Sequence, residues 1–180
     1  MRLLTVSRDG RKTGGLRGFH ASGDNWTMKE QSSIRPGRPE DQPQLLEIVW
    51  ATVMDSDSDR EQLLAQPELV EVPVEHLSDE TSVVAVIDGA PVGFATVLPR
   101  PDGDAELDGL FVLPERQRLG IGRALVAETM RLARAMGAGM LHVTANEDAR
   151  EFYHAVGFVQ TGTAPTALKP APKMELRLSE

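Results

Sequence analysis

The stretch LFVLPERQRLGIGRALVAETMRLARAMG, residues 110–137, joins an apolar segment typical of a strand to an amphipathic helix through a basic turn. The turn contains Gly120 and Gly122, next to Arg118 and Arg123. Free N–H groups in the first helical turn and the helix dipole favour a bound anion, and glycines let it approach the backbone closely. The stretch therefore predicts a pyrophosphate site. The alternative is a helix start that is decorated with arginines and binds no ligand.

Two common phosphate-binding motifs do not fit this turn. A Walker loop requires a Gly-Lys pair, and the chain contains none. A Rossmann fingerprint requires a third small residue three positions after the second glycine, where this chain has Leu125. Nucleoside triphosphates and dinucleotides are therefore not the expected ligands.

Length and composition predict one soluble domain. The chain has 180 residues, of which 41% are hydrophobic and 26% charged, and it contains no cysteine. Disulfides, thiol nucleophiles and thiolate metal ligands are thereby excluded. No apolar run is long enough to span a bilayer, and the N-terminal apolar patch is too short for a secretory signal. We expect a cytoplasmic protein with no membrane partner.

The charge is unevenly distributed along the chain. The net charge is −8, and residues 33–180 carry thirteen basic against twenty-four acidic side chains. Nucleic acid is therefore not an expected partner, whereas an acidic surface attracts cations or serves only solubility. Residues 1–30 lack periodicity and contain scattered glycines, which predicts a flexible tail before a single domain at residues 31–180.

Periodicity from residue 33 onward alternates between strand and helix patterns. Strands are expected at residues 33–36, at 81–99 as a hairpin around Asp88-Gly89, and at 105–114, 140–145 and 173–178. Helices are expected from Pro39, at 60–77 with breaks at Pro67 and Pro73, from Gly120 to Gly137, and after an Asn146 cap. One face of the Gly120 helix would bury Ile121, Leu125, Leu132 and Met136. This order predicts a mixed sheet with helices packed against it.

Two separated motifs carry a family resemblance. QRLGIG, residues 117–122, resembles the Q/R-x-x-G-x-G/A signature of the GNAT superfamily of N-acetyltransferases. ANEDAREFYHAVGF, residues 145–158, is similar to that family's later N-x-x-A-x-x-F-Y-x-x-x-G-F segment. The resemblance covers residues 33–180. It implies an α/β (α+β) fold with a mostly antiparallel central sheet of about six to seven strands and about four helices.

The resemblance also implies acetyl-CoA as co-substrate. Backbone groups of Leu110, Phe111 and Val112 would pair with the pantetheine arm, and the turn would hold the pyrophosphate. Asn146 would lie near the pantetheine. The turn residues concerned are Gln117, Arg118, Leu119, Gly120, Ile121, Gly122 and Arg123.

Acetyl transfer by direct attack of an amine needs few protein groups. Tyr153, the only tyrosine of the chain, matches the family position of the acid that protonates the leaving thiolate. Glu106 lies fourteen residues before Gly120, a spacing similar to that of the general base in the histone-acetylating branch. Asp108 should project from the same strand face and is an alternative, as is a chain of waters.

The acceptor site is expected near Trp50 and the DSDSDRE segment, residues 55–61. This segment resembles the start of a calcium loop, but Arg60 replaces the required glycine and Gln66 the bidentate glutamate. We predict a solvated loop, with attraction of a cationic amine as the alternative. No metal is expected, and His142 is predicted to be a buried core residue whose ring has polar partners.

The sequence therefore predicts an acetyl-CoA-dependent N-acetyltransferase that acts on a primary amine of a small molecule. One alternative is an acyl-CoA-binding module without catalysis. Another is a protein acetyltransferase that acts on a lysine or an N-terminal amine. Members of the family often pair, so the resemblance also implies a homodimer.

Overall fold

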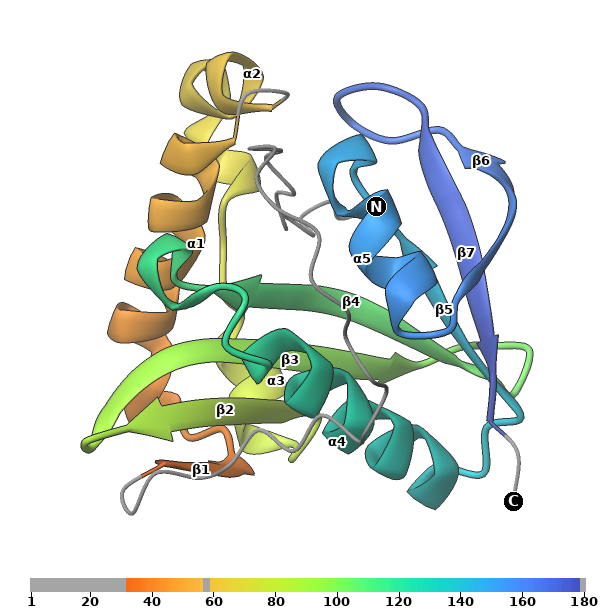
Figure 1. The fold of residues 1–180 in the computed structure, drawn as a ribbon, viewed down its shortest axis with the longest axis horizontal. Coiled ribbons are helices and arrows are strands. Elements are labelled where there is room, and N and C mark those ends of the chain that lie inside the picture. Colours follow the sequence, from red (N-terminus) through yellow and green to blue (C-terminus); the bar gives the residue numbers. More distant parts are fainter. Residues whose placement is uncertain (1–31, 57–58, 179–180) are drawn as a thin grey trace, which may run out of the picture.

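A seven-stranded sheet forms the centre of the computed structural model, which describes residues 32–56 and 59–178 (Figure 1). The tail expected at residues 1–30 lies outside the described residues. In sheet order the strands are β1 (Ser32–Pro36), β2 (Ser82–Ile87), β3 (Ala90–Pro99), β4 (Ala105–Val112), β5 (Met140–Thr144), β7 (Ala171–Arg177) and β6 (Val159–Ala164). All neighbours are antiparallel except β4 and β5. The predicted fold class is confirmed.

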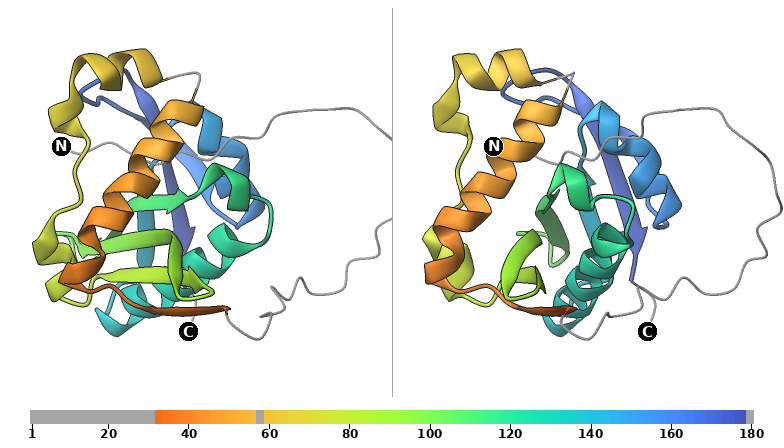
Figure 2. Two further views of the ribbon diagram at one scale, coloured as in Figure 1. Left: turned by 90° about the vertical axis from the view of Figure 1, so that its left-hand side faces the viewer. Right: turned by 60° about the vertical axis from the view of Figure 1, so that its left-hand side comes forward.

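Helices cover both faces of this sheet (Figure 2). On one face lie α1 (Gln42–Asp55), α2 (Arg60–Ala65) and α3 (Val74–Ser78), and on the other α4 (Ile121–Ala135) and α5 (Arg150–Ala155). The hairpin strands alternate between the two layers, because successive side chains of a strand point to opposite faces. Val83 and Ala85 pack with α4, whereas Val84 and Val86 pack with α1.

Short 3-10 turns precede or link several helices, at Pro39–Asp41, Pro67–Leu69, Pro114–Arg116 and Glu147–Ala149. The predicted helix start near Pro39 and the breaks at Pro67 and Pro73 are therefore confirmed. Gly120 caps α4, and Gly137 follows its end with φ +84°. Because φ is positive at both glycines, other residues there would be strained.

Two expectations about individual elements are wrong. The predicted order of elements lacks β6, whose residues Val159–Thr163 are all exposed and so show no apolar alternation. Only its pairing with β7 makes this segment a strand. Met136 is 38% exposed, because α4 has already ended at Ala135. Among the described residues, no helix is long and apolar enough to cross a membrane.

Strands β4 and β5 run side by side only at their beginnings. The register pairs Ala105 with Leu141 and Glu106 with His142, and no further pair follows in the described chain. Figure 1 shows the two strands diverging from there. Beyond Glu106, β4 therefore keeps β3 on one edge, and no strand of residues 32–56 and 59–178 pairs with its other edge.

Candidate active site

The free edge of β4 can accept an extended ligand. The Leu113 N–H donates to Val92 O on β3 at 2.9 Å. Because backbone groups alternate along a strand, the polar groups of Val112 and Leu110 point to the opposite edge, where β5 has diverged. Those of Phe111 point towards β3. Of the three predicted cofactor-contacting residues, Leu110 and Val112 therefore have their backbone groups in the required direction, and Phe111 does not.

The glycine turn follows directly after this edge. Arg118 and Gly120 have φ of +62° and +82°, and this left-handed backbone leads into the first turn of α4. The α4 helix has fifteen residues, and its first N–H groups and its dipole favour an anion. Arg118, Leu119 and Arg123 are exposed.

Two residues of the turn have structural roles besides ligand binding. The Gln117 side-chain amide donates to the carbonyl of Val112 at 3.3 Å, which ties the turn to the end of β4. Ile121 is completely buried in the core beneath α4. Its backbone N–H therefore remains the only group with which Ile121 could contact a ligand.

The second family motif, residues 145–158, lies on the other side of the point where β4 and β5 diverge. Asn146 is buried, and its side-chain oxygen accepts from Ala149 N at 2.9 Å, which confirms the predicted cap. Tyr153 is completely buried on α5. Its ring lies edge-on to Phe152 and Phe158, with ring centroids 5.3 and 5.2 Å apart. These contacts orient the only phenol of the chain.

Glu106 and Asp108 lie on the same side of β4 but have different surroundings. The carboxylate of Glu106 forms an ion pair with Arg100, with the two atoms 2.5 Å apart. Asp108 is the additional residue of a β-bulge, because Thr96 pairs with Gly109 and Val97 with Leu107. Bulges redirect side chains next to active sites. The sequence favoured Glu106 as the base, whereas the structure places Asp108 at the wall of a pocket.

This pocket lies between β3, β4 and the segment that joins α2 to α3, and it is open to solvent. Its lining includes two carboxylates, those of Asp108 and Glu71, and the imidazole of His76. The rings of Phe94 and Phe111 stack 5.2 Å apart in its wall. Leu69, Val72, Pro73, Thr96 and Gly109 complete the lining. Sequence analysis did not identify Glu71, which is exposed between α2 and α3, or His76, which lies on the short helix α3, because neither belongs to a motif that the sequence shows.

The predicted solvated loop after α1 is only partly correct. Of its aspartates, Asp57 lies outside the described residues, and Asp59 is only 1% exposed. The carboxylate of Asp59 lies 2.7 Å from the Lys169 ammonium and accepts from the Asn146 side-chain amide at 3.4 Å. Nothing in the sequence indicates the pairing with Lys169. A charged partner from a distant loop is what permits this burial.

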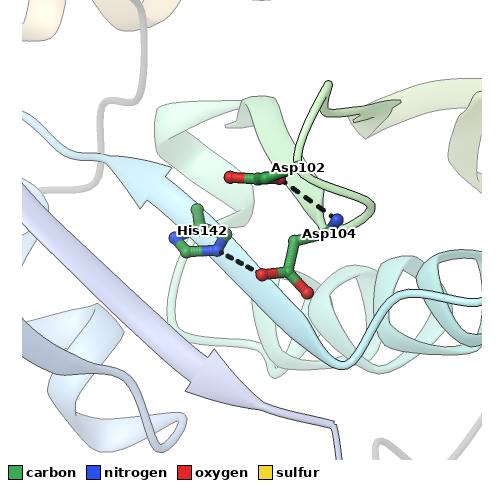
Figure 3. A group of neighbouring side chains, drawn as sticks. All are labelled: Asp102, Asp104 and His142. Carbon is green, nitrogen blue, oxygen red and sulfur yellow. Dashed lines mark hydrogen bonds and ion pairs between the residues drawn. The ribbon is translucent and has the colours of Figure 1, made fainter.

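A cluster of polar side chains lies where β4 and β5 begin, at the end where the two strands are paired (Figure 3). His142 is buried, with Nε2 3.2 Å from Asp104 and Nδ1 3.4 Å from Glu175, which confirms its predicted core position. Asp104 also accepts from the N–H groups of Gly139 and Met140. Asp102, Asp104 and His142 each bring one ligand atom within 4.8 Å of the other two, a spacing that suits a metal ion.

These groups already have other partners. Hydrogen bonds from the Arg100 guanidinium, opposed by desolvation, lower the pKa of Asp102 to about 2. The hydrogen bond from His142 likewise lowers the pKa of Asp104. We therefore assign the cluster a structural role, which is to hold the start of β5 against β4.

Comparison with known proteins identifies related acetyltransferases. The model of the Acetyltransferase (GNAT) family matches residues 43–158. Peptidyl-lysine N-acetyltransferase YjaB of Escherichia coli (strain K12) is 30% identical over 147 residues, which cover 80% of this chain and 95% of that protein. A GCN5-related N-acetyltransferase from Rhodopseudomonas palustris is 27% identical with a TM-score of 0.67, over 84% of this chain and 98% of that one.

A third similarity concerns the fold alone. YncA from Salmonella typhimurium, a structure that contains acetyl-CoA, is 21% identical with a TM-score of 0.61. It covers 84% of this chain and 96% of that one. The family match includes both the glycine turn and the segment with Tyr153. The chain therefore belongs to the GNAT family of acetyltransferases and is an acetyl-CoA-dependent N-acetyltransferase.

Proposed function

We propose that this acetyltransferase acts on a primary amine of a small molecule, which binds in the pocket beside Asp108. The observation that carries the proposal is the combination of Asp108 and Glu71 with stacked aromatic rings in the wall of one pocket. Carboxylates attract the ammonium form of an amine, and aromatic faces accommodate both its carbon chain and its charge. The pocket adjoins β4, whose free edge would hold the acetyl donor.

The proposed reaction needs one proton acceptor and one proton donor. The bound ammonium first releases one proton to solvent, and the neutral amine then attacks the thioester carbonyl, so that a C–N bond forms and the C–S bond breaks. The proton that leaves the amine nitrogen passes to Asp108, directly or through water, and Tyr153 protonates the departing thiolate. We prefer Asp108 to Glu106 as base, because Glu106 is held by Arg100. Exposed turn residues Arg118 and Arg123 add positive charge for the pyrophosphate.

A lysine side chain of a protein is the second candidate acceptor. This acceptor is favoured by the similarity of the chain to YjaB of Escherichia coli, a peptidyl-lysine N-acetyltransferase. A lysine side chain carries the same ammonium group as a small amine, so the carboxylates of the pocket suit both. Pairing of two copies of the chain is expected from the resemblance, and sedimentation of the purified protein would test it.

The experiment begins with calorimetric titration of acetyl-CoA into protein cleared of bound CoA. We expect a dissociation constant in the micromolar range, about −8 kcal/mol. Thiol release is then measured with a panel of small amines and with lysine peptides, and the products are identified by mass spectrometry. Turnover of small amines alone supports the first acceptor class. Turnover of peptides alone supports the second and contradicts the first.

A further inference from the structure

We propose that Asp59 is a positioning residue whose buried carboxylate holds two segments, the β6–β7 loop and the turn before α5, against the start of α2 on the acceptor side of the active site. The inference rests on the proposed function, because it concerns the same pocket. Asp59 is only 1% exposed. It caps α2, and the chain that continues from α2 supplies Leu69, Glu71 and Val72 to the pocket wall.

The first segment that Asp59 holds is the loop between β6 and β7. The Asp59 Oδ1 atom lies 2.7 Å from the ammonium of Lys169, which belongs to this loop. The Thr166 hydroxyl organises this loop by accepting from the N–H groups of Leu168 and Lys169 at 3.3 and 3.1 Å. Leu168 packs against the apolar cluster that also contains Val72 and Phe111. The loop therefore crosses from the half of the sheet with β7 to the half with the pocket.

The second segment is the turn that leads into α5. The Asn146 side-chain amide donates to Asp59 Oδ2 at 3.4 Å, while its oxygen caps the following turn. A second contact joins the same two regions, because the Ser56 hydroxyl donates to Asp148 at 3.4 Å. Ser56 also accepts from the Asp59 N–H at 3.3 Å. The end of α1 is thereby linked to the turn before the helix that carries Tyr153.

These contacts span the divergence between β4 and β5. On one side lie the pocket and Asp108, and on the other lie Asn146 and Tyr153, which belong to elements beyond β5. Of this ion pair only Asp59 is buried, because the Lys169 side chain is 34% exposed, and burial of a carboxylate rarely adds stability over apolar residues of similar size, because the ion loses its hydration. We therefore interpret this pair as one that specifies a single arrangement of the segments it joins. We infer that the arrangement it selects sets the distance between the acceptor pocket and Tyr153.

The test compares Asp59→Asn, Lys169→Met and the double variant with the wild-type enzyme. Misplacement of reacting groups by about 1 Å costs about 10²-fold in rate, so we expect kcat/KM for the amine to fall about 10²-fold in all three. In the double variant no charge is left buried without a partner, so its melting temperature should recover. Hydrogen exchange at residues 165–169 and 145–149 should accelerate in all three.

Asp41→Asn is the matched control. Asp41 is also buried, pairs with Arg35 at 2.7 Å, and precedes the opposite end of α1. We expect it to lower the melting temperature while kcat/KM and exchange at residues 165–169 stay unchanged. Recovery of wild-type kcat/KM in the double variant would overturn the positioning role, as would unchanged exchange at 165–169 in Asp59→Asn. If the wild type turns over no amine, the proposed function fails, and hydrogen exchange alone still decides the role of Asp59.

Discussion

Gly122, in the first turn of α4, lies against the ring of Phe152 on α5. A Cβ atom on Gly122 would stand 3.2 Å from two carbons of that ring, which is tighter than nine in ten real Cβ contacts. The two family motifs, far apart in the chain, therefore pack directly on each other. A side chain at position 122 would therefore push against the α5 helix.

This contact predicts the effect of Gly122→Ala. The methyl group displaces Phe152, whose ring lies edge-on to Tyr153, so we expect lower turnover and a loss of about 1–3 kcal/mol of stability. Urea unfolding and steady-state kinetics measure the two effects. Gly162→Ala is the control, because a Cβ there meets no atom within 4 Å. Equal behaviour of the two variants would contradict the packing role.

Gly120→Ala tests the pyrophosphate site. A non-glycine residue at φ +82° costs about 1–2 kcal/mol, and rearrangement of the turn should weaken acetyl-CoA binding. Gly103 has φ +90° in open space, so Gly103→Ala carries the same strain away from the turn. Calorimetry should detect weaker acetyl-CoA binding only in Gly120→Ala. Wild-type affinity in that variant would leave the turn without a role in binding.

Tyr153→Phe tests the proposed acid. Phenylalanine keeps the edge-on ring contacts with Phe152 and Phe158, so the fold and the affinity for acetyl-CoA should change little. Loss of a general acid lowers turnover by about 10²-fold or more. The measurement is kcat across pH with a good amine substrate. Unchanged kcat at every pH would remove Tyr153 from the mechanism.

Comparison of Asp108→Asn with Glu106→Gln identifies the carboxylate that serves the acceptor. Both substitutions remove one negative charge from the same side of β4. We expect Asp108→Asn to lower kcat/KM about 10²-fold, because it removes the proposed base and a charge of the pocket. Glu106→Gln should reduce it less, since that carboxylate is engaged by Arg100. The reverse order would restore Glu106 as the base.

Acidification should weaken the fold between about pH 4 and pH 2. Hydrogen bonds from Arg35 lower the pKa of Asp41, and those from Arg100 lower the pKa of Asp102 to about 2. A carboxylate with a lowered folded-state pKa contributes stability above its unfolded pKa, near 3.8, and loses it as pH falls through the folded value. Urea unfolding at several pH values should show a shallower loss in Asp41→Asn. An identical pH dependence in the wild type and in Asp41→Asn would show that protonation of Asp41 does not cause the loss of stability.

Local patterns were sufficient for most of the fold. The Asp88-Gly89 hairpin, the glycine at each end of α4 and the Asn146 cap all depend on interactions within a few residues, and each was confirmed. Strand β6 could not be predicted in this way, because its exposed residues show no alternation. Its identity depends on β7, which follows it in the chain.

Of the residues around the proposed acceptor pocket, some follow from local sequence patterns and others only from tertiary contacts. The sequence by itself determined the turn, the helix with Tyr153 and two candidate carboxylates on β4, because each follows from a motif or from period-2 alternation. Only the tertiary structure decided that a bulge brings Asp108 to the pocket, that Arg100 engages Glu106, and that Lys169 neutralises Asp59. These outcomes depend on contacts between segments far apart in the chain, and local sequence patterns carry no information about which distant charges will meet.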